Sequence, residues 1–323
     1  MPLTLEQKNK RKLSQVKNEI VKSAVGLEGN GIDIPIFHQC REALLNNIPT
    51  LNVAWEDRGN DYTDTYNQYG MLESCLSYQY DLISQFIKTP SQETYNKLLN
   101  AYFLKVIYFI AQKNYKESLN NGFDTDRTLS LFFAMMYCDH YIQSEMMDVL
   151  AYYKNHEEFN RDEDGIGSFF GEKTILPLAY HFYTQVQQNK TWSFDLSNVE
   201  DNKGKPVCAH IMANITPLYQ KIIDNIETDD MALLQELIDE LCQYRLDHSK
   251  GNYLLEFNGN MAEYFPIEIL FLLKHRVEKG HSIDGIHHIL IDDFLPYFLK
   301  DFIVSDDNKV FGERALSGRY MNE

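Results

Sequence analysis

Four histidines near the C-terminal end are the residues whose type and spacing come nearest to a metal site. Histidine is the commonest metal ligand in proteins, because a neutral imidazole nitrogen binds many metal ions. The four residues are His275, His281, His287 and His288. They are not spaced four residues apart on one predicted helix, and no cysteine or pair of carboxylates completes a ligand set. The sequence therefore predicts surface or packing roles for these histidines and no bound metal.

Other patterns that carry chemistry are incomplete in this sequence. Glu278 and His281 have the Glu-x-x-His spacing of di-iron helical bundles, but Gly280 places them at a helix end, and the sequence holds no second pair. Residues 165–167, Gly-Ile-Gly, resemble a dinucleotide-binding loop only superficially, because no predicted strand precedes them and the glycine spacing is wrong. We therefore expect no catalytic residue and no cofactor. An enzyme with an unfamiliar site stays a competing hypothesis.

Cysteine usage and hydropathy bear on the cellular compartment. The cysteines are widely spaced, odd in number and without a C-x-x-C pair, which is typical of reduced core thiols in a reducing compartment. The N-terminal residues lack the apolar core of a secretory signal, and no run reaches the roughly 18 apolar residues of a spanning helix. We expect a cytoplasmic protein that does not cross a membrane. The cysteines are Cys40, Cys75, Cys138, Cys208 and Cys242.

Net charge is the strongest compositional feature of the chain. The 30 Lys and Arg residues and 47 Asp and Glu residues give a formal net charge of -17. Residues 1–22 contain six bases and two acids, so the remaining chain contains 24 bases and 45 acids, a net charge of -21. Such a field repels nucleic acid and anionic membranes and attracts a basic protein partner. The alternative interpretation is that acidity serves solubility alone.

Acidic side chains in predicted loops are the remaining candidates for a functional surface. Carboxylates interleaved with aromatic residues suit an interface that neutralises a basic partner. The best candidate lies within residues 157–164, near Phe159, Phe169 and Phe170. The alternative interpretation of this stretch is a solvated linker. The candidate contact residues are Glu157, Glu158, Asp162, Glu163 and Asp164, with Glu56, Asp57, Asp61, Tyr62 and Asp64 as a second cluster, and Asp229 and Asp230 as a third.

The elements that would position these residues are predicted to be helices almost throughout. Gly and Pro are few, at 16 and 9, and apolar residues recur with helical spacing. We expect an all-α fold, a multi-helix bundle or stacked helical hairpins. Residues 47–63 are expected to form a loop and the tail from Ser305 to be loose. The predicted helices are Leu5–Val21, Ile36–Leu45, Asp64–Lys88, a helix capped by Thr89, residues 126–154, Ile175–Gln188, His210–Ile226, a helix capped by Thr228, Ala262–Val277 and Ile283–Leu299.

The chain is predicted to fall into regions that could form two subdomains. Residues 155–171 break the helical pattern with an acidic and then glycine-rich stretch, which makes them the best candidate boundary. The predicted regions are an N-terminal helical region at 1–155, a region of one helix between an acidic loop and a polar linker at 156–204, a C-terminal helical region at 205–304, and a polar tail at 305–323.

The C-terminal third has a distinctive order of predicted elements. Residues 211–229, IMANITPLYQKIIDNIETD, describe a helix that ends in a short acidic turn, and residues 231–246 form a Leu-rich amphipathic helix. The stretches YFPIEILFLLKHRVEKGHSID and DDFLPYFL follow after a loop. This order resembles the immunity protein family numbered 49 of bacterial polymorphic toxin systems, mainly across residues 205–300. The residues that fit the pattern of that family are Pro266, Ile267, Leu270, Gly280, Ile283, Leu295 and Pro296.

The resemblance implies a cytoplasmic antitoxin that binds and blocks a cognate toxin domain without catalysis. Toxins of this kind are often nucleases with basic active-site clefts, and such a partner would match the acidity of this chain. The competing hypothesis is an acidic helical scaffold or regulatory adaptor that binds a different protein. On either hypothesis we expect a protein partner, and neither nucleic acid nor a membrane.

Overall fold

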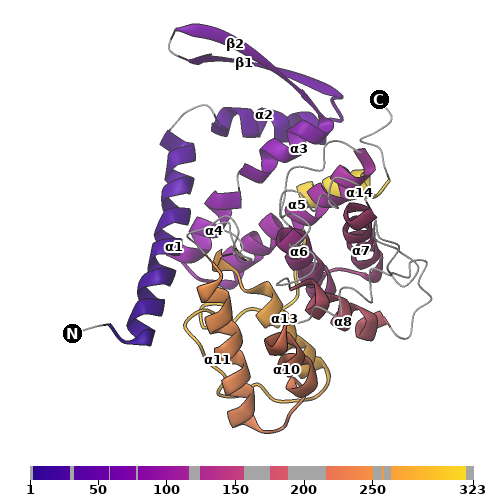
Figure 1. Ribbon diagram of the computed structural model, residues 1–323. Helices are drawn as coiled ribbons and strands as arrows, with labels where there is room; N and C mark the ends of the chain where they lie inside the picture. The colour runs from indigo at the N-terminus through magenta and orange to yellow at the C-terminus, as the bar shows by residue number, and fades with distance from the viewer. Residues whose placement is uncertain are drawn as a thin grey trace, which may run out of the picture. The chain divides into compact units, whose positions relative to one another are not determined.

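The protein is mostly α-helical, as the sequence predicts, with one two-stranded antiparallel sheet (Figure 1). No helix in the described part of the chain is long and apolar enough to cross a membrane. The structure is a computed structural model. It describes residues 3–29, 33–57, 59–77, 79–115, 124–155, 175–187, 216–249, 257 and 263–317.

Two compact units divide the chain. The first contains residues 1–13 and 120–300, and the second contains residues 14–119 and 301–323. The contacts therefore change partners near residues 13, 120 and 300, whereas the sequence analysis placed a boundary at residues 155–171, most of which lie outside the described residues. Helix α1 (Leu5–Gly29) contributes to both units, because the division falls between Leu13 and Ser14.

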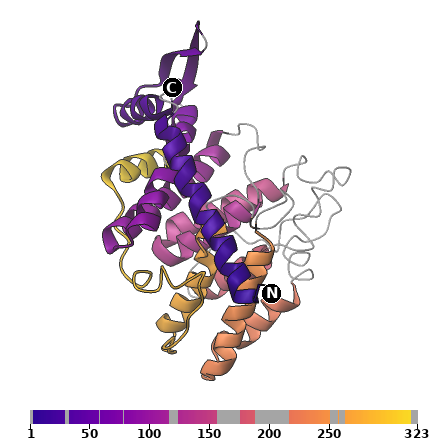
Figure 2. The same ribbon diagram turned by 90° about the vertical axis from the view of Figure 1, so that its left-hand side faces the viewer.

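The second unit is built around helix α5 (Gln92–Tyr115), whose side chains are buried almost all round from Leu98 to Gln112. Helices α3, α4 and α14 pack on α5, and α2 packs on α3. Figure 2 shows the same helices from a second direction. The bounds of the helices around α5 are α2 Asp33–Leu45, α3 Gln68–Ser77, α4 Gln79–Lys88 and α14 Asp306–Leu316.

Helix α5 begins two residues later than the sequence analysis predicts. Thr89 was expected to be the N-cap, but the backbone N–H of Thr94 donates to Ser91 Oγ at 3.2 Å and the N–H of Ser91 donates to Thr94 Oγ1 at 3.0 Å. This reciprocal pair is a capping arrangement that satisfies two N–H groups at the helix start. The prediction was wrong because Ser91, paired with Thr94, caps the helix in place of Thr89.

Residues 306–316 of the C-terminal tail form a packed helix and not the loose segment that their polar composition predicts. Ser305 caps α14 by accepting from the N–H of Asn308 at 3.3 Å. The Asn308 side-chain amide donates to the carbonyl of Asn100 in α5 at 2.8 Å. Phe311 and Ala315 are buried on the same face of α14. The helix is therefore fixed by one apolar stripe and by a buried amide contact that binary patterning does not reveal.

Residues 50–67 form a β-hairpin, which corrects the predicted loop at 47–63 and the predicted helix beginning at Asp64. Strand β1 (Thr50–Asp57) pairs with strand β2 (Asn60–Asn67), and Gly59 has a φ of 80° at the turn. The stretch is rich in Val, Thr, Tyr and Trp, which favour pleated strands, and apolar residues recur at every second position of β1. Helix α3 begins only at Gln68.

The described residues of the first unit include six further helices, of which α6 packs against three others. Helices α7, α8 and α13 pack on α6, while α10 packs on α8 and α11. The predicted helix 126–154 is two helices, because Asp139 accepts the N–H groups of Tyr141 and Ile142 and so starts a new one. The bounds are α6 Asp124–Tyr137, α7 His140–Asn155, α8 Leu176–Gln187, α10 Pro217–Asn225, α11 Met231–Asp247 and α13 Ile267–Glu278.

The segment after α13 is a series of turns and not the helix predicted at Ile283–Leu299. Gly280 and Gly285 have φ values of 90° and 82°, which ends α13 and prevents a regular helix from starting at Ile283. Pro296 adds a third interruption. Five apolar residues of the segment are nevertheless buried, so the periodicity identified core residues but not their backbone conformation. These residues are Ile286, Leu290, Ile291, Phe294 and Phe298.

A buried ion pair joins α11 to α13 in the core of the first unit. Arg245 donates to the Glu268 carboxylate and to the carbonyl of Phe265, and its guanidinium also lies 4.4 Å from the centroid of the Phe257 ring. Both charged side chains are almost wholly inaccessible to solvent, at 1% and 0% exposed. Burial raises the pKa of Glu268, and Arg245 acts in the opposite direction.

Candidate functional site

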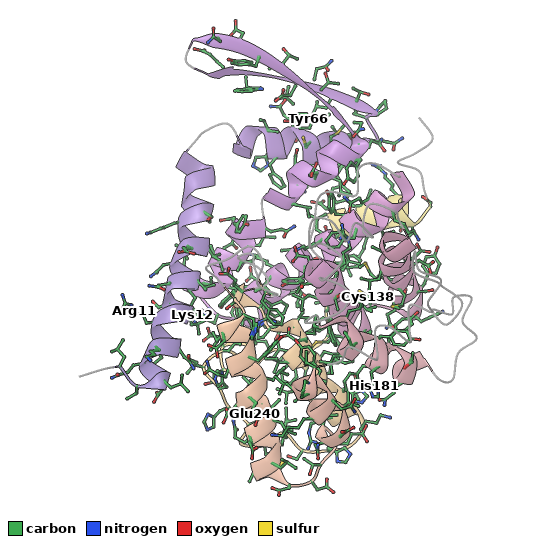
Figure 3. All side chains as sticks on the ribbon, viewed as in Figure 1. Arg11, Lys12, Tyr66, Cys138, His181 and Glu240 are labelled. Carbon is green, nitrogen blue, oxygen red and sulfur yellow. The ribbon has the colours of Figure 1, made fainter. Side chains whose placement is uncertain are left out.

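The β1–β2 hairpin brings the second predicted acidic cluster onto one element. Glu56 is in register with Asp61, Trp55 with Tyr62, and Val53 with Asp64. Successive side chains of a strand point to opposite faces, so the hairpin has two faces of different character. Figure 3 shows these side chains standing off the hairpin, with Tyr66 labelled near its inner end.

One face of the hairpin is apolar and aromatic. Val53 is buried at 2% exposed, whereas Tyr62 near the turn is 43% exposed. The rings of Trp55 and Tyr62 stack with their centroids 4.5 Å apart and an angle of 19° between their planes. The indole Nε1 of Trp55 donates to Asp64 Oδ2 at 2.7 Å. The stack therefore holds a partly exposed aromatic surface with a carboxylate at its side, which is a suitable arrangement for an interface.

The opposite face is polar and carries two carboxylates directly across from each other. Glu56 and Asp61 are both exposed, and neither forms an ion pair or hydrogen bond within the part of the chain that the structure describes. Like charges at opposed positions of an antiparallel pair destabilise the hairpin. Asp57 is in register with Asn60 next to the turn, and its side chain lies outside the described residues. This face therefore presents negative charge that the fold itself does not use.

The first predicted cluster cannot be placed, because residues 157–164 lie outside the described residues. The same holds for Phe159, Phe169 and Phe170.

The third predicted cluster lies at the turn between α10 and α11, and its carboxylates stabilise the fold. Asp230 is the N-cap of α11 and accepts the N–H groups of Ala232 and Leu233 at 2.9 and 3.2 Å. Asp229 accepts from or pairs with His281 Nδ1 at 3.0 Å. The predicted cap, Thr228, instead accepts the N–H of Asp230 at 3.2 Å. Acids are favoured at the start of a helix, so the fold accounts for this cluster without a protein partner.

A polar cavity of about 420 Å³ lies beside the same turn, between α8 and the end of α10. His181, Phe182 and Gln185 line it from α8, opposite Asp224 and Glu227. His181 is labelled in Figure 3, and burial lowers its pKa. Two carboxylates and an imidazole line the cavity. They are not arranged to bind a metal ion together, and no other group of His, Cys, Asp or Glu side chains among the described residues is.

The predicted histidine cluster does not converge on one point. His275 is buried, and its Nε2 lies 3.6 Å from Glu227 Oε1. Burial lowers the pKa of His275, the ammonium of Lys279 lowers it further, and Glu227 acts in the opposite direction. His281 pairs with Asp229, and the Nδ1 of His288 accepts the N–H of Leu290 at 3.1 Å. These three imidazoles therefore take packing and turn-stabilising roles.

The described cysteines are free thiols, and most of them lie in the core. Burial raises the pKa of the thiols of Cys40, Cys75, Cys138 and Cys242, which keeps them protonated at neutral pH. They are free cysteines, and Cys40, Cys75 and Cys242 are buried.

Comparison with known proteins gives no relative: no protein-family model, no curated protein and no solved structure matches this chain. The resemblance of residues 205–300 to immunity proteins therefore depends on the residues quoted for it. One functional candidate was missed in the sequence analysis, namely Trp55. The signal that could have found it is the alternation of Leu51, Val53 and Trp55 in a stretch that was interpreted as a loop.

Proposed function

We propose that this protein is an immunity protein that binds a basic toxin domain, and that the β1–β2 hairpin contacts that domain. The observation that carries the proposal is the pair of exposed carboxylates, Glu56 and Asp61, in register on one face of the hairpin with no partner in the described part of the chain. Folding gains nothing from this pair, so a cationic partner is the natural source of compensation.

The aromatic face of the hairpin complements this charge. Tyr and Trp are enriched where interfaces gain most of their binding energy, because they bury large areas with little loss of conformational freedom. Trp55 and Tyr62 stack on each other and provide an apolar anchor of this kind. They form the cross-strand pair next to that of Glu56 and Asp61. The net charge of -17 adds a long-range field that speeds the approach of a cationic domain.

The resemblance to immunity proteins specifies the partner as a toxin domain encoded next to this gene. The test is to express that domain in a bacterial host with and without this protein and to measure survival and complex formation. We expect survival only when both are present, with a stoichiometric complex. A neighbouring product that is harmless, or that is toxic and remains unbound, overturns the proposal. A harmless product that binds the hairpin instead supports the scaffold hypothesis.

A matched pair of charge variants locates the interface. The double substitution Glu56→Lys with Asp61→Lys raises the net charge by four elementary charges, as does Asp301→Lys with Glu313→Lys elsewhere in the same unit. Asp301 and Glu313 are exposed and form no ion pair in the part of the chain that the structure describes. We expect the hairpin variant to associate more slowly than the control, with a difference that shrinks as salt rises. Equal rates for the two variants remove the hairpin from the interface.

A further inference from the structure

The outer edge of the hairpin is an unused set of backbone hydrogen-bonding groups. The ladder runs without interruption from Thr50↔Asn67 to Asp57↔Asn60. The sheet formed by the described residues has two strands, so each strand keeps one edge of N–H and C=O groups that no neighbouring strand pairs. Figure 1 shows β2 on the side of β1 that is turned away from α2, so the edge of β2 does not face that helix.

Apart from its acidic side chains, this edge has none of the usual features that prevent strand addition. Edge strands are commonly protected by Lys, by Pro, by bulges or by being very short. Strands β1 and β2 contain neither Lys nor Pro, are each 8 residues long, and pair without a bulge. A two-stranded hairpin alone is marginally stable in water, and such a ladder becomes stable by packing against a helix, as this one does where it meets α2 and α3, or by adding a third strand.

Charge determines which strand the edge accepts. Strand β2 contains Asp61 and Asp64 and no basic residue. Pairing of β2 with β2 of a second copy therefore brings only like charges together, which costs free energy in any register. A strand with Lys or Arg side chains reverses the sign of the same interactions. The acids protect the hairpin against self-association and leave it open to a basic strand.

We propose that an extended, positively charged segment of the protein partner adds to the edge of β2 as a third strand. Backbone hydrogen bonds to β2 supply affinity, and basic side chains of the segment lie beside Asp61 and Asp64. Because Asp61 and Asp64 are three residues apart, they project from opposite faces, so the segment carries bases three residues apart as well. This inference rests on the proposed function and specifies how the hairpin takes hold of its basic partner.

Two synthetic peptides test the backbone contribution. The first is Lys-Val-Thr-Lys-Val-Thr-Lys-Val, whose lysines match the spacing of Asp61 and Asp64. The second is Lys-Pro-Pro-Lys-Pro-Pro-Lys-Pro, which has equal charge and spacing but cannot form a strand ladder. Titration into the full-length protein at low salt is expected to show roughly tenfold tighter binding of the first peptide, as several backbone bonds together supply. Asp61→Lys with Asp64→Lys should abolish binding, and Asp301→Lys with Glu313→Lys should preserve it.

Residue-resolved hydrogen exchange provides the decisive readout. In a strand, alternate N–H groups point to the same edge, so strand addition should increase protection most at every second amide of residues 60–67, where the N–H points to the added strand. Equal affinity for the two peptides, or protection that is no greater at these amides than at the others, overturns strand addition and leaves the survival test of the proposed function unaffected. Failure of both peptides to bind also overturns it. The function itself fails only when the neighbouring toxin domain is not bound or not neutralised.

Discussion

The hairpin at residues 50–67 and the turn between α10 and α11 are two acidic regions that the structure uses in different ways. At the turn, Asp230 caps a helix and Asp229 pairs with an imidazole. At the hairpin, Glu56 and Asp61 are opposed and have no partner within the described residues. Both regions contain clustered acids in the sequence. The difference teaches that an acidic cluster indicates a binding surface only where its carboxylates neither cap helices nor form ion pairs within the fold.

Some exposed acids on the helices also form ion pairs within the fold. Glu236 and Glu240 of α11 both accept from Lys221 Nζ, at 3.0 and 2.8 Å. Glu240 is labelled on α11 in Figure 3. An exposed pair of this kind contributes little to stability, but it neutralises the charge that a basic partner would otherwise meet. The hairpin thus differs from α11 as well as from the turn, and substitutions can measure the difference.

The largest effect should come from the carboxylate that the fold uses most. Glu268→Ala leaves Arg245 buried and without its ion pair, which is expected to lower the free energy of unfolding by about 3–5 kcal/mol. Urea denaturation of the variant and the wild type measures this directly. Glu268→Gln keeps a hydrogen-bond acceptor and should lose less. A loss below that of a typical surface substitution for Glu268→Ala would show that the pair is not buried as the structure has it.

The pH dependence of stability should show the contribution of the buried histidines of the first unit. Burial lowers the pKa values of His181, His275 and His288 in the first unit. For each group the unfolded state binds a proton more readily than the folded state, so stability falls as pH drops below the unfolded pKa of about 6.5. The loss is complete once the pH lies below the folded-state values. Above pH 7 these groups contribute no pH dependence.

Thermal unfolding between pH 7.5 and pH 5 measures this effect, and His275→Gln isolates the most buried of the three imidazoles. His275 faces Glu227, Lys279 and His181, so the acid favours its protonation while the two bases oppose it. The variant should lose less stability than the wild type over the same range. An identical slope in both proteins assigns the pH dependence to other groups.

The sequence predicted most helices and much of the core, because a helical apolar stripe is visible in one dimension. Leu13, Val16 and Ile20 of α1 are buried as their spacing predicts. The hairpin was missed because its polar positions, such as Asp61 and Asp64, resemble a loop when alternation is ignored. Residues 283–299 were misassigned because buried turns keep the composition of a helix. A binding surface could be recognised only from the contacts in the structure, because no sequence pattern distinguishes an acid that caps a helix from an acid without a partner.

A smaller effect is expected at the helix cap of the turn. Asp230→Ala removes the acceptor for two N–H groups at the start of α11 and should lower the free energy of unfolding by about 1 kcal/mol. Asp229→Ala is the matched control, because it removes an adjacent acid whose side chain is 93% exposed and loses only a surface pair. The control should change stability less. Neither substitution should alter association with the toxin domain, and slower association of either variant would assign the turn to the interface.

The smallest effect should have the opposite sign, and it comes from the hairpin. Asp61→Lys places a base across from Glu56 and converts a repulsive cross-strand pair into an attractive one. Such a pair contributes about 0.2–1 kcal/mol to a strand ladder, so hydrogen exchange of residues 50–67 should slow. Association with a basic partner should weaken at the same time, because the negative charge presented to it is lost. The double variant Glu56→Lys with Asp61→Lys restores the repulsion with reversed sign, so its hairpin should exchange as fast as the wild type. A more stable hairpin together with weaker binding would indicate that Asp61 is retained for binding although it destabilises the hairpin. Faster exchange in Asp61→Lys than in the wild type would show that Asp61 stabilises the hairpin, and the two acidic regions would then differ in degree and not in kind.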